Sequence, residues 1–209
     1  TSENTSVYAN YIEGLTKGAV APQTANDLPV SNGGQVFAPY KSRQKEIGFK
    51  WQGQQLGATV ALYTTDMPSA YVANQVFGQY GKQRNSGLEA TVFGEPVKGL
   101  RVLGGVTFSE AKIREAADAT TIGNYAIGVP KRLLNLGVDW DVPGVSGLAL
   151  NARVMHTSSQ YANGANTLKV ASWTRTDIGA RYLMDIGNNR LLTVRARIDN
   201  LFDLSLIHI

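Results

Sequence analysis

The chain has 209 residues, no cysteine, a formal net charge of +4 and 17% charged residues, against roughly 25% in an average soluble domain. The lack of cysteine excludes a disulfide framework and a thiolate metal site, and the small, evenly scattered charge contains no basic run that could follow nucleic-acid phosphates. No stretch approaches the run of about 18 apolar residues that a membrane helix needs, which excludes a helical membrane protein.

Apolar and polar residues alternate with a period of two along most of the chain. The alternation covers residues 6–12, 45–51, 56–63, 88–93, 100–108, 134–140, 148–155, 177–182 and 191–199. In the second of these segments, for example, Ile47 and Phe49 fall on one face, whereas Glu46 and Lys50 fall on the other. This period is typical of half-buried β-strands, and no helical period persists over a useful length. The sequence therefore predicts an all-β protein of about nine strands.

The connections between these strands are of two kinds that alternate strictly. Short turns rich in Gly, Pro and Asn are expected at 52–55, 94–99, 142–147 and 186–189. Long polar or aromatic loops are expected at about 13–42, 66–82, 113–128 and 157–172. Tight turns at one end and long loops at the other are typical of an outer-membrane β-barrel.

A soluble β-sandwich also alternates with a period of two and is the alternative fold. Two details favour the barrel. Trp51 and Trp140 lie where strands enter short turns, the place of an interfacial aromatic girdle. The face opposite the apolar one carries charged residues, as a polar lumen would: Glu46, Lys50, Glu89, Arg101, Asp139, Arg153, Asp177, Arg181, Arg195 and Arg197. We therefore predict an antiparallel transmembrane β-barrel segment.

Several segments, in this order, resemble the C-terminal portion of TonB-dependent siderophore receptors. They are NTSVYANYIEG, RQKEIGFKW, RNSGLEATVFGEPVKGLRVLGGVTFSEAKI, IGVPKRLLNLGVDWDVPG and, above all, RIDNLFD. The resemblance covers residues 5–203. It implies a 22-stranded outer-membrane barrel whose lumen holds an N-terminal plug domain. The plug and the external loops bind a ferric siderophore, and TonB acts on the plug to admit it.

This resemblance implies that the chain holds only part of a receptor. We expect residues 1–203 to be a partial barrel that lacks the plug, the TonB-binding segment and the last strand, and that is open and curved as a result. In the family, NLFD ends the penultimate strand, but the six residues LSLIHI resemble no family loop and look like a translated sequencing adapter. We expect residues 204–209 to be a non-native tail.

Two other functions are weighed against the receptor. A passive outer-membrane porin would have a similar polar lumen without the resemblance at NLFD. An outer-membrane hydrolase could use Ser158, His156 and Asp177 as a triad, but nothing in the pattern singles these residues out, and His156 has no second ligand at metal spacing. We therefore expect no enzymatic activity, no metal site and no covalently bound cofactor. The expected partners are a ferric siderophore, outer-membrane lipid and, through the plug, TonB.

Two groups of site residues follow from the resemblance. The side chains expected to line the lumen and face the plug are Glu46, Lys50, Glu89, Arg101, Arg153, Arg181, Arg195 and Arg197. Large aromatic side chains in external loops give contact area to a chelate at a low entropy cost. Those expected to bind the siderophore are Tyr71, Phe77 and Tyr80 in one loop and Tyr125 in the next.

Overall fold

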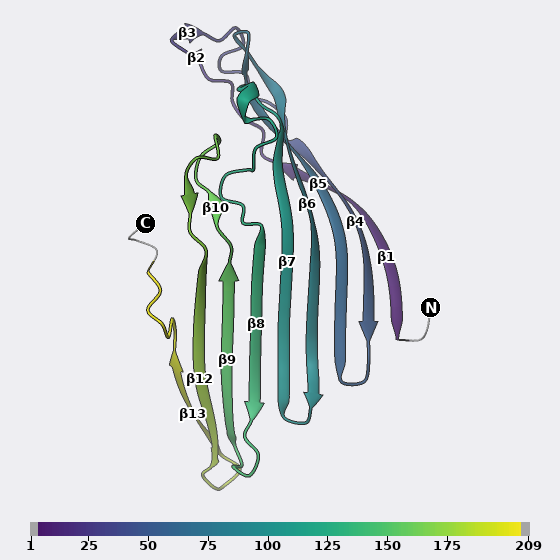
Figure 1. Ribbon diagram of the computed structural model, residues 1–209, viewed down its shortest axis with the longest axis vertical. Coiled ribbons are helices and arrows are strands. Elements are labelled where there is room, and N and C mark those ends of the chain that lie inside the picture. Colours follow the sequence, from purple (N-terminus) through teal and green to yellow (C-terminus); the bar gives the residue numbers. More distant parts are fainter. Residues whose placement is uncertain (1–3, 206–209) are drawn as a thin grey trace.

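The computed structural model describes residues 4–205, and most of this part of the chain is β-structure. The main sheet consists of β1 (Thr5–Thr16), β4 (Tyr40–Gln52), β5 (Leu56–Ala73), β6 (Val76–Val97), β7 (Leu100–Glu115), β8 (Arg132–Asp141), β9 (Leu148–Thr157), β12 (Trp173–Asp185) and β13 (Leu191–Ile198) (Figure 1). The loops contain two small ribbons, β2 (Thr24–Ala25) with β3 (Leu28–Pro29) and β10 (Gln160–Tyr161) with β11 (Lys169–Val170), and the 3-10 helix η1 (Ala119–Thr121). No helix in residues 4–205 is long and apolar enough to cross a membrane.

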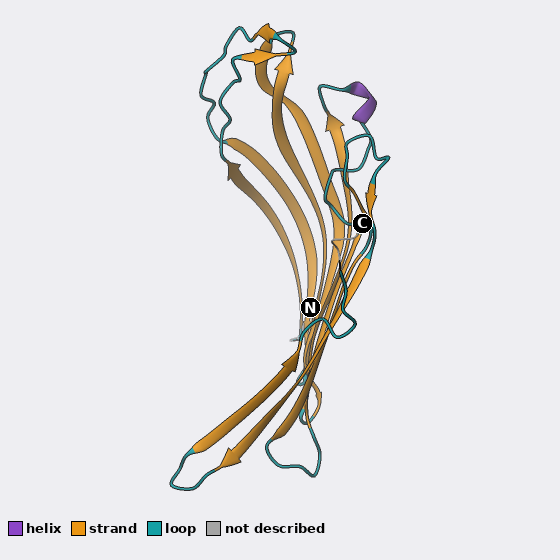
Figure 2. Ribbon diagram, turned by 90° about the vertical axis from the view of Figure 1, so that its left-hand side faces the viewer, coloured by secondary structure: helices purple, strands orange, loops and turns teal. Residues whose placement is uncertain are grey.

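The nine long strands form one sheet in which each strand pairs with the next long strand along the chain. Every pair is antiparallel, and β1 and β13 form the two edges. Within the described residues the sheet is therefore open, and Figure 2 shows that it bends strongly along its length. The predicted all-β, antiparallel, open and curved segment of about nine strands is confirmed.

The register of the strands separates the sheet into two faces. Phe49, Val60, Ala90, Val106 and Leu134 lie side by side across β4 to β8. Because side chains alternate between the faces of a strand, all of them project to one side, which we call the apolar face. The residues between them in sequence project to the other side, which we call the polar face. The alternation predicted from the sequence thus holds across neighbouring strands.

The apolar face has no cover within the described chain. Ile47 is 55% exposed, Leu62 54% and Val194 49%. Apolar surface of this extent is rare on soluble monomers and marks a protein or membrane contact. A sandwich would bury one face of the sheet under a second sheet, which residues 4–205 do not contain. The structure thus excludes the sandwich alternative for this part of the chain.

Glycines in the strands provide space for aromatic side chains on the polar face. Gly48 lies opposite Tyr8, Gly57 opposite Phe93 and Gly87 opposite Tyr63 in the register. A Cβ added at Gly57 would lie 2.6 Å from the Phe93 ring, and the aromatic partners of the other two glycines are equally close. Each ring therefore covers the glycine on the adjacent strand, which explains why strands of a stable sheet tolerate so many glycines.

The prediction of a long loop at about residues 66–82 is wrong. β5 and β6 continue as a paired hairpin to Ala73 and Val76, and only Asn74 and Gln75 form the turn, with φ values of 48° and 61°. Two residues with positive φ make the tight turn that matches the twist of a hairpin. Pro68 in β5 is untypical of a strand, and an extra residue in β6 opposite Ser69–Tyr71 interrupts the alternation of that strand, so the sequence of this segment looked irregular.

The other three long connections, residues 17–39, 116–131 and 158–172, are confirmed. Strands reach one to four residues into the expected loops, and the second loop extends to residue 131. The short turns lie at the opposite end of the sheet from these loops (Figure 1). Of the expected tail at 204–209, the structure describes Leu204 and Ser205, and residues 206–209 lie outside the described part. The boundary at residue 203 therefore stays a prediction.

Arginine substitutions at two adjacent residues, one on each face and at the same level along the strands, can test which face contacts lipid. Val106→Arg in the full-length protein would place a charge on the apolar face, between Ala90 and Leu134. We expect a loss of about 2–4 kcal/mol in the free energy of unfolding in lipid vesicles if this row lies near the bilayer midplane. The control is Thr107→Arg, on the polar face opposite Glu89, which should cost less. Equal costs for the two variants would contradict the membrane orientation of the sheet.

Candidate functional site

All eight residues predicted to line a lumen project from the polar face. One row across the sheet shows the arrangement: Arg101 lies opposite Asp139, Asp139 opposite Asn151, and Gly179 opposite both Asn151 and Arg197. The alternation along each strand places the rest on the same side. The eight are Glu46, Lys50, Glu89, Arg101, Arg153, Arg181, Arg195 and Arg197.

Arginines concentrate in the part of the polar face that β7, β8, β9, β12 and β13 form. The Arg101 guanidinium donates to both carboxylate oxygens of Asp141 at 2.8 Å and also to Asp139. Arg181 lies 3.7 Å from Asp141, and Arg195 is its register partner on β13. A hollow of about 590 Å³ in this region is lined by four arginines and one acid, together with Asn151, Ala180 and Ala196. Its charged lining is therefore predominantly basic.

Asp177 on β12 connects the polar face to the segment after β13. The residue is 3% exposed, and its carboxylate accepts hydrogen bonds from the Arg175 Nε at 2.8 Å and from the Asn200 backbone amide at 2.8 Å. Arg197 adds a longer contact of 3.5 Å. A buried carboxylate needs such partners, and here one of them is the first residue of the NLFD motif. Asp177 thus fixes the turn at the end of β13.

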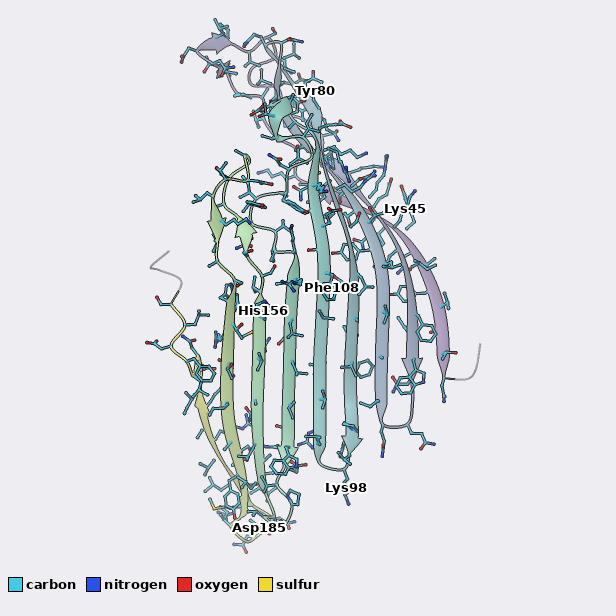
Figure 3. All side chains as sticks on the ribbon, viewed as in Figure 1. Lys45, Tyr80, Lys98, Phe108, His156 and Asp185 are labelled. Atoms are coloured by element: carbon cyan, nitrogen blue, oxygen red, sulfur yellow. The ribbon has the colours of Figure 1, made fainter. Side chains whose placement is uncertain are left out.

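The structure does not assemble the triad considered as an alternative. His156 lies opposite Leu134 and Thr174 on the apolar face, and its Nδ1 is 2.8 Å from the Thr174 hydroxyl (Figure 3). Asp177 projects from the polar face, so the sheet separates the two side chains. The Ser158 hydroxyl instead accepts a hydrogen bond from the Arg132 amide at 3.0 Å. Residues 4–205 also contain no group of three or more His, Cys, Asp or Glu that could hold a metal ion.

Tyr71 and Tyr80 form an aromatic pair near the tip of the β5–β6 hairpin. Their ring centroids are 5.6 Å apart in an edge-to-face arrangement. Between Ser69 and Tyr71 the register shifts because β6 contributes one extra residue, so β5 keeps its alternation and Tyr71 stays on the polar-face side. The Tyr80 ring lies over Gly78, the register partner of Tyr71. Tyr80 is 40% exposed, so this pair offers an open aromatic surface.

Phe77, predicted to contact the siderophore, is buried. It is 8% exposed and packs with Ala21 and Val30 of the loop 17–39. The Phe37 ring meets it edge to face at 5.3 Å. In this arrangement Phe77 presents no surface to a ligand and instead anchors the loop. Its predicted ligand contact stays untested, and the burial argues against it.

One asparagine side chain holds the loop 17–39 against the hairpin tip. The Asn32 amide donates to the Phe77 carbonyl at 2.9 Å and accepts from the Phe77 amide at 2.8 Å. The side chain thereby satisfies both backbone groups of one residue, as a neighbouring strand would. The Ser31 amide also donates to the Gln75 carbonyl at 2.7 Å. The loop and the hairpin thus form one connected unit.

A second pair of loops is joined in the same way. The Asn166 amide donates to the Tyr125 carbonyl at 2.9 Å and accepts from the Tyr125 amide at 2.7 Å. The Tyr125 ring stacks on Tyr161 at 5.9 Å. Three lysines surround the stack: Lys131 and Lys112 lie 3.8 and 5.4 Å from the Tyr125 centroid, and Lys169 lies 5.0 Å from that of Tyr161.

The four aromatic residues predicted as one binding group thus occupy three places. Tyr71 and Tyr80 are together, Phe77 is buried beneath a loop, and Tyr125 belongs to another pair of loops. Tyr125 pairs with Lys112, which projects on the apolar-face side of β7, so it faces away from the Tyr71 side. The ligand role of these residues stays a prediction.

Sequence reasoning missed the residues that order the loops. Asn32 and Asn166 are polar residues in polar loops, and no pattern in one sequence marks their distant partners. Asn166 has a φ of 58°, a backbone state that asparagine tolerates better than most residues. The loop 116–131 also has a local cap: the Thr120 hydroxyl and amide donate to Asp118 at 2.6 and 2.9 Å, which lowers the pKa of Asp118 below its ordinary value.

The two hydrogen bonds between the Asn32 side chain and the Phe77 backbone, which we call the Asn32 clamp, predict that the loop 17–39 becomes less ordered when Asn32 is replaced. Asn32→Ala removes both partners of the Phe77 backbone, and leaving such groups unsatisfied costs about 1–3 kcal/mol. We expect faster hydrogen–deuterium exchange at Phe77 and through residues 17–39 of the full-length protein, without change in β7 to β9. The control is Gln79→Ala, an exposed residue on the same hairpin. Unchanged exchange at Phe77 in Asn32→Ala would contradict the clamp.

The hydrogen bonds that Asp177 accepts predict a different local effect. Asp177→Ala leaves the Asn200 amide and Arg175 without this acceptor, so we expect the unfolding free energy to fall by about 1–3 kcal/mol. Exchange should accelerate at Asn200 and along β13. Asp199→Ala removes an acid that is 53% exposed and also pairs with Arg175 and Arg197, and it should cost under about 1 kcal/mol. A larger loss at Asp199 than at Asp177 would show this assignment wrong.

Comparison with known proteins places this sheet in a family. The family model described as "TonB dependent receptor-like, beta-barrel" matches residues 1–201. The ferrichrome receptor FcuA of Yersinia enterocolitica is 46% identical over 200 residues, which are 95% of this chain and 26% of FcuA. The ferrichrome outer membrane transporter/phage receptor of Escherichia coli (strain K12) is 30% identical over 183 residues, 83% of this chain and 24% of the transporter.

A solved structure agrees with this result. BauA, the ferric preacinetobactin receptor from Acinetobacter baumannii, superposes with a TM-score of 0.85 at 37% identity, covering 96% of this chain and 30% of BauA. The chain spans about a quarter of the length of the curated relatives described above. The family model covers nearly all of the sequence, and the sheet has the fold of a solved receptor barrel. The chain therefore belongs to the TonB-dependent receptors, as part of their outer-membrane β-barrel.

Proposed function

We propose that the protein containing this chain imports a ferric siderophore across the outer membrane in a TonB-dependent manner. The observation that carries the proposal is the match of an entire nine-stranded sheet, at 46% and 37% identity, to proteins named as ferrichrome and ferric preacinetobactin receptors. Ferrichrome-type chelates are the first ligands to test, because the relative at 46% identity is named for ferrichrome. We propose no catalytic role for the chain.

Siderophore binding is assigned to aromatic side chains at the end of the sheet that carries the long loops. Tyr71 and Tyr80 are the strongest candidates, because the pair is open and Tyr71 projects on the side of the polar face. Phe77 contributes indirectly by fixing the loop 17–39 beside them. Tyr125 remains a candidate with its surrounding lysines, but it faces the other side of the sheet.

The eight charged residues of the polar face are assigned to the lumen, against the plug. A barrel lumen is polar whatever fills it. The arginines around the 590 Å³ hollow, however, outnumber the acids of its lining four to one. A plug surface that packs here is therefore expected to present carboxylates or backbone carbonyls. TonB would act on the receptor through that plug and not through this sheet.

A passive porin is the competing function, and energy dependence distinguishes the two. The test expresses the full-length receptor in an iron-starved host that lacks its own siderophore receptors and measures uptake of ⁵⁵Fe-loaded ferrichrome. Saturable uptake that disappears when TonB is deleted supports the proposal. Uptake that persists without TonB and rises linearly with concentration would identify a porin. A failure with ferrichrome alone leads to the same assay with catecholate chelates.

The aromatic pair gives the binding prediction. Replacing Tyr71 and Tyr80 together by Ala removes the open aromatic surface, and hot-spot aromatic side chains contribute about 2 kcal/mol or more. We expect the affinity for the transported chelate to fall about thirtyfold or more, while barrel assembly is unchanged. The control is Trp51→Ala at the short-turn end, which should affect stability and not affinity. Parent-like affinity in the double variant, for every chelate that the parent imports, would remove this pair from the site.

A further inference from the structure

Asparagine followed by glycine is chemically labile, and the chain contains two such steps, Asn32–Gly33 and Asn163–Gly164. The glycine nitrogen can attack the side-chain amide of the preceding asparagine, because glycine has no Cβ that would hinder the approach. Asparagine is counted among the thermolabile residues. Both steps lie in long loops, and both asparagine side chains hold hydrogen bonds there. The structure places the two steps in opposite chemical environments.

At the first step, the nucleophile and the leaving group are both engaged. The Gly33 amide donates to the Val30 carbonyl at 3.0 Å. The Asn32 side-chain nitrogen donates to the Phe77 carbonyl and to the Gln35 side chain, both at 2.9 Å. An attack by Gly33 would require that its own hydrogen bond and the Asn32 clamp both break. This step is therefore protected as long as its loop is folded.

At the second step, the nucleophile is free. No hydrogen bond within residues 4–205 has the Gly164 amide as its donor. Gly164 follows Asn163 in a turn that the Asn166 amide closes on the Asn163 carbonyl at 3.2 Å. Both residues of the step are partly exposed, so water reaches this turn. Hydroxide from the solvent can therefore remove the proton of the Gly164 amide.

The side-chain carbonyl of Asn163 is polarised for attack. Its Oδ1 accepts hydrogen bonds from the Thr167 amide at 3.0 Å and from the Leu168 amide at 3.1 Å. Two backbone N–H groups at this distance stabilise the negative charge that develops on an attacked carbonyl oxygen, as in an oxyanion hole. They also determine the orientation of the side-chain amide, since only its oxygen can accept from both groups.

A hydroxyl group lies next to the leaving nitrogen. The Asn163 Nδ2 donates to the Thr167 Oγ1 at 2.7 Å. Once the side-chain carbon has become tetrahedral, Nδ2 is basic, and the Thr167 hydroxyl is close enough to give it a proton. A free nucleophile, a polarised carbonyl and a proton donor thus surround one side chain.

We propose that Asn163 is a site of spontaneous deamidation in the folded receptor and that its own loop assists the reaction. The Gly164 nitrogen loses its proton to solvent and forms a bond to the Asn163 Cγ. The Cγ–Nδ2 bond breaks, and ammonia leaves with a proton that the Thr167 hydroxyl supplies and that water replaces. Water then opens the resulting succinimide at either carbonyl, which gives aspartate or isoaspartate. Water is the only co-reactant.

Isoaspartate at position 163 adds one atom to the backbone where two loops meet. The Gly164 carbonyl accepts from the Asn124 side chain at 2.9 Å, and Asn166 binds both backbone groups of Tyr125. A longer backbone before Gly164 displaces these contacts, so the modification separates the two loops. The receptor thus carries a bond whose slow reaction changes the order of its loops with age, whichever chelate it transports.

The experiment incubates the purified full-length receptor at physiological temperature and mildly alkaline pH, and mass spectrometry quantifies deamidation at both Asn-Gly steps. We expect Asn163 to react at least about tenfold faster than Asn32 while the receptor is folded. In receptor unfolded in urea the two steps should react at similar rates, because the difference is due to the fold. Equal rates in the folded receptor, or a difference that persists in urea, would overturn the proposal.

Two variants of Thr167 test the proton donor. Thr167→Val removes the hydroxyl but keeps the shape and the backbone amide, and it should slow deamidation at Asn163 about tenfold or more. Thr167→Ser restores the hydroxyl and should return the rate to within about twofold of the parent. Asn32 in the same molecules is the control for folding, since its rate stays low only in a folded loop. An unchanged rate in the valine variant, or a serine variant as slow as the valine variant, would contradict the assisted reaction.

The effect on the loops has its own readout. Hydrogen–deuterium exchange at Tyr125 should be faster in receptor that carries isoaspartate at position 163 than in unmodified receptor. Exchange in β4 and β5, which lie away from these loops, should be the same in both forms. Equal exchange at Tyr125 in the two forms would contradict the effect of the modification on the loops.

Discussion

Backbone hydrogen bonding is the constraint on which the rest of this structure depends. In a hydrocarbon layer each N–H and C=O must find a partner within the protein, and each unpaired group costs several kcal/mol. Each of the seven inner strands has a paired neighbour on both sides, whereas β1 and β13 have a neighbouring strand on one side only within the described residues. The outer edge of β1 cannot remain open in lipid. A sheet of this kind therefore requires further strands, which agrees with relatives about four times as long.

The same requirement explains how the loops are ordered. Phe77 lies in the part of β6 that extends beyond the end of β7, and Tyr125 lies in a loop, so neither has a neighbouring strand on the side to which its free N–H and C=O point. The side-chain amides of Asn32 and Asn166 take that place, each donating one hydrogen bond and accepting one. Asparagine is well suited, because its short side chain carries a donor and an acceptor in the geometry of a peptide group. In both places a side chain therefore makes the hydrogen bonds that a neighbouring strand makes within the sheet.

The features that could be predicted from the sequence are those that depend on a short repeating pattern of residues. A period of two determines which residues share a face, so the strands, the two faces and the eight polar-face residues follow from it. The hairpin of β5 and β6 was missed because its turn is Asn-Gln and not a sequence typical of tight turns, and because Pro68 and a bulge disturb the alternation. The burial of Phe77 was missed for another reason. It depends on residues more than forty positions away, which no local pattern encodes.

The distribution of charge shows why composition alone gave an incomplete account. Along the sequence the basic residues look evenly scattered, and a net charge of +4 is modest. The register gathers many of them into two regions on opposite faces. One is the arginine-lined hollow of the polar face, and the other is the row on the apolar face that includes Arg43, Arg84 and Lys112. Residues such as Arg43 and Arg84 are forty-one positions apart but lie in one row, separated only by Asp66. Because paired strands are held in a fixed register, residues that are far apart in the sequence lie side by side in rows across the sheet. A weak average charge can therefore produce two basic surfaces on opposite faces of one sheet.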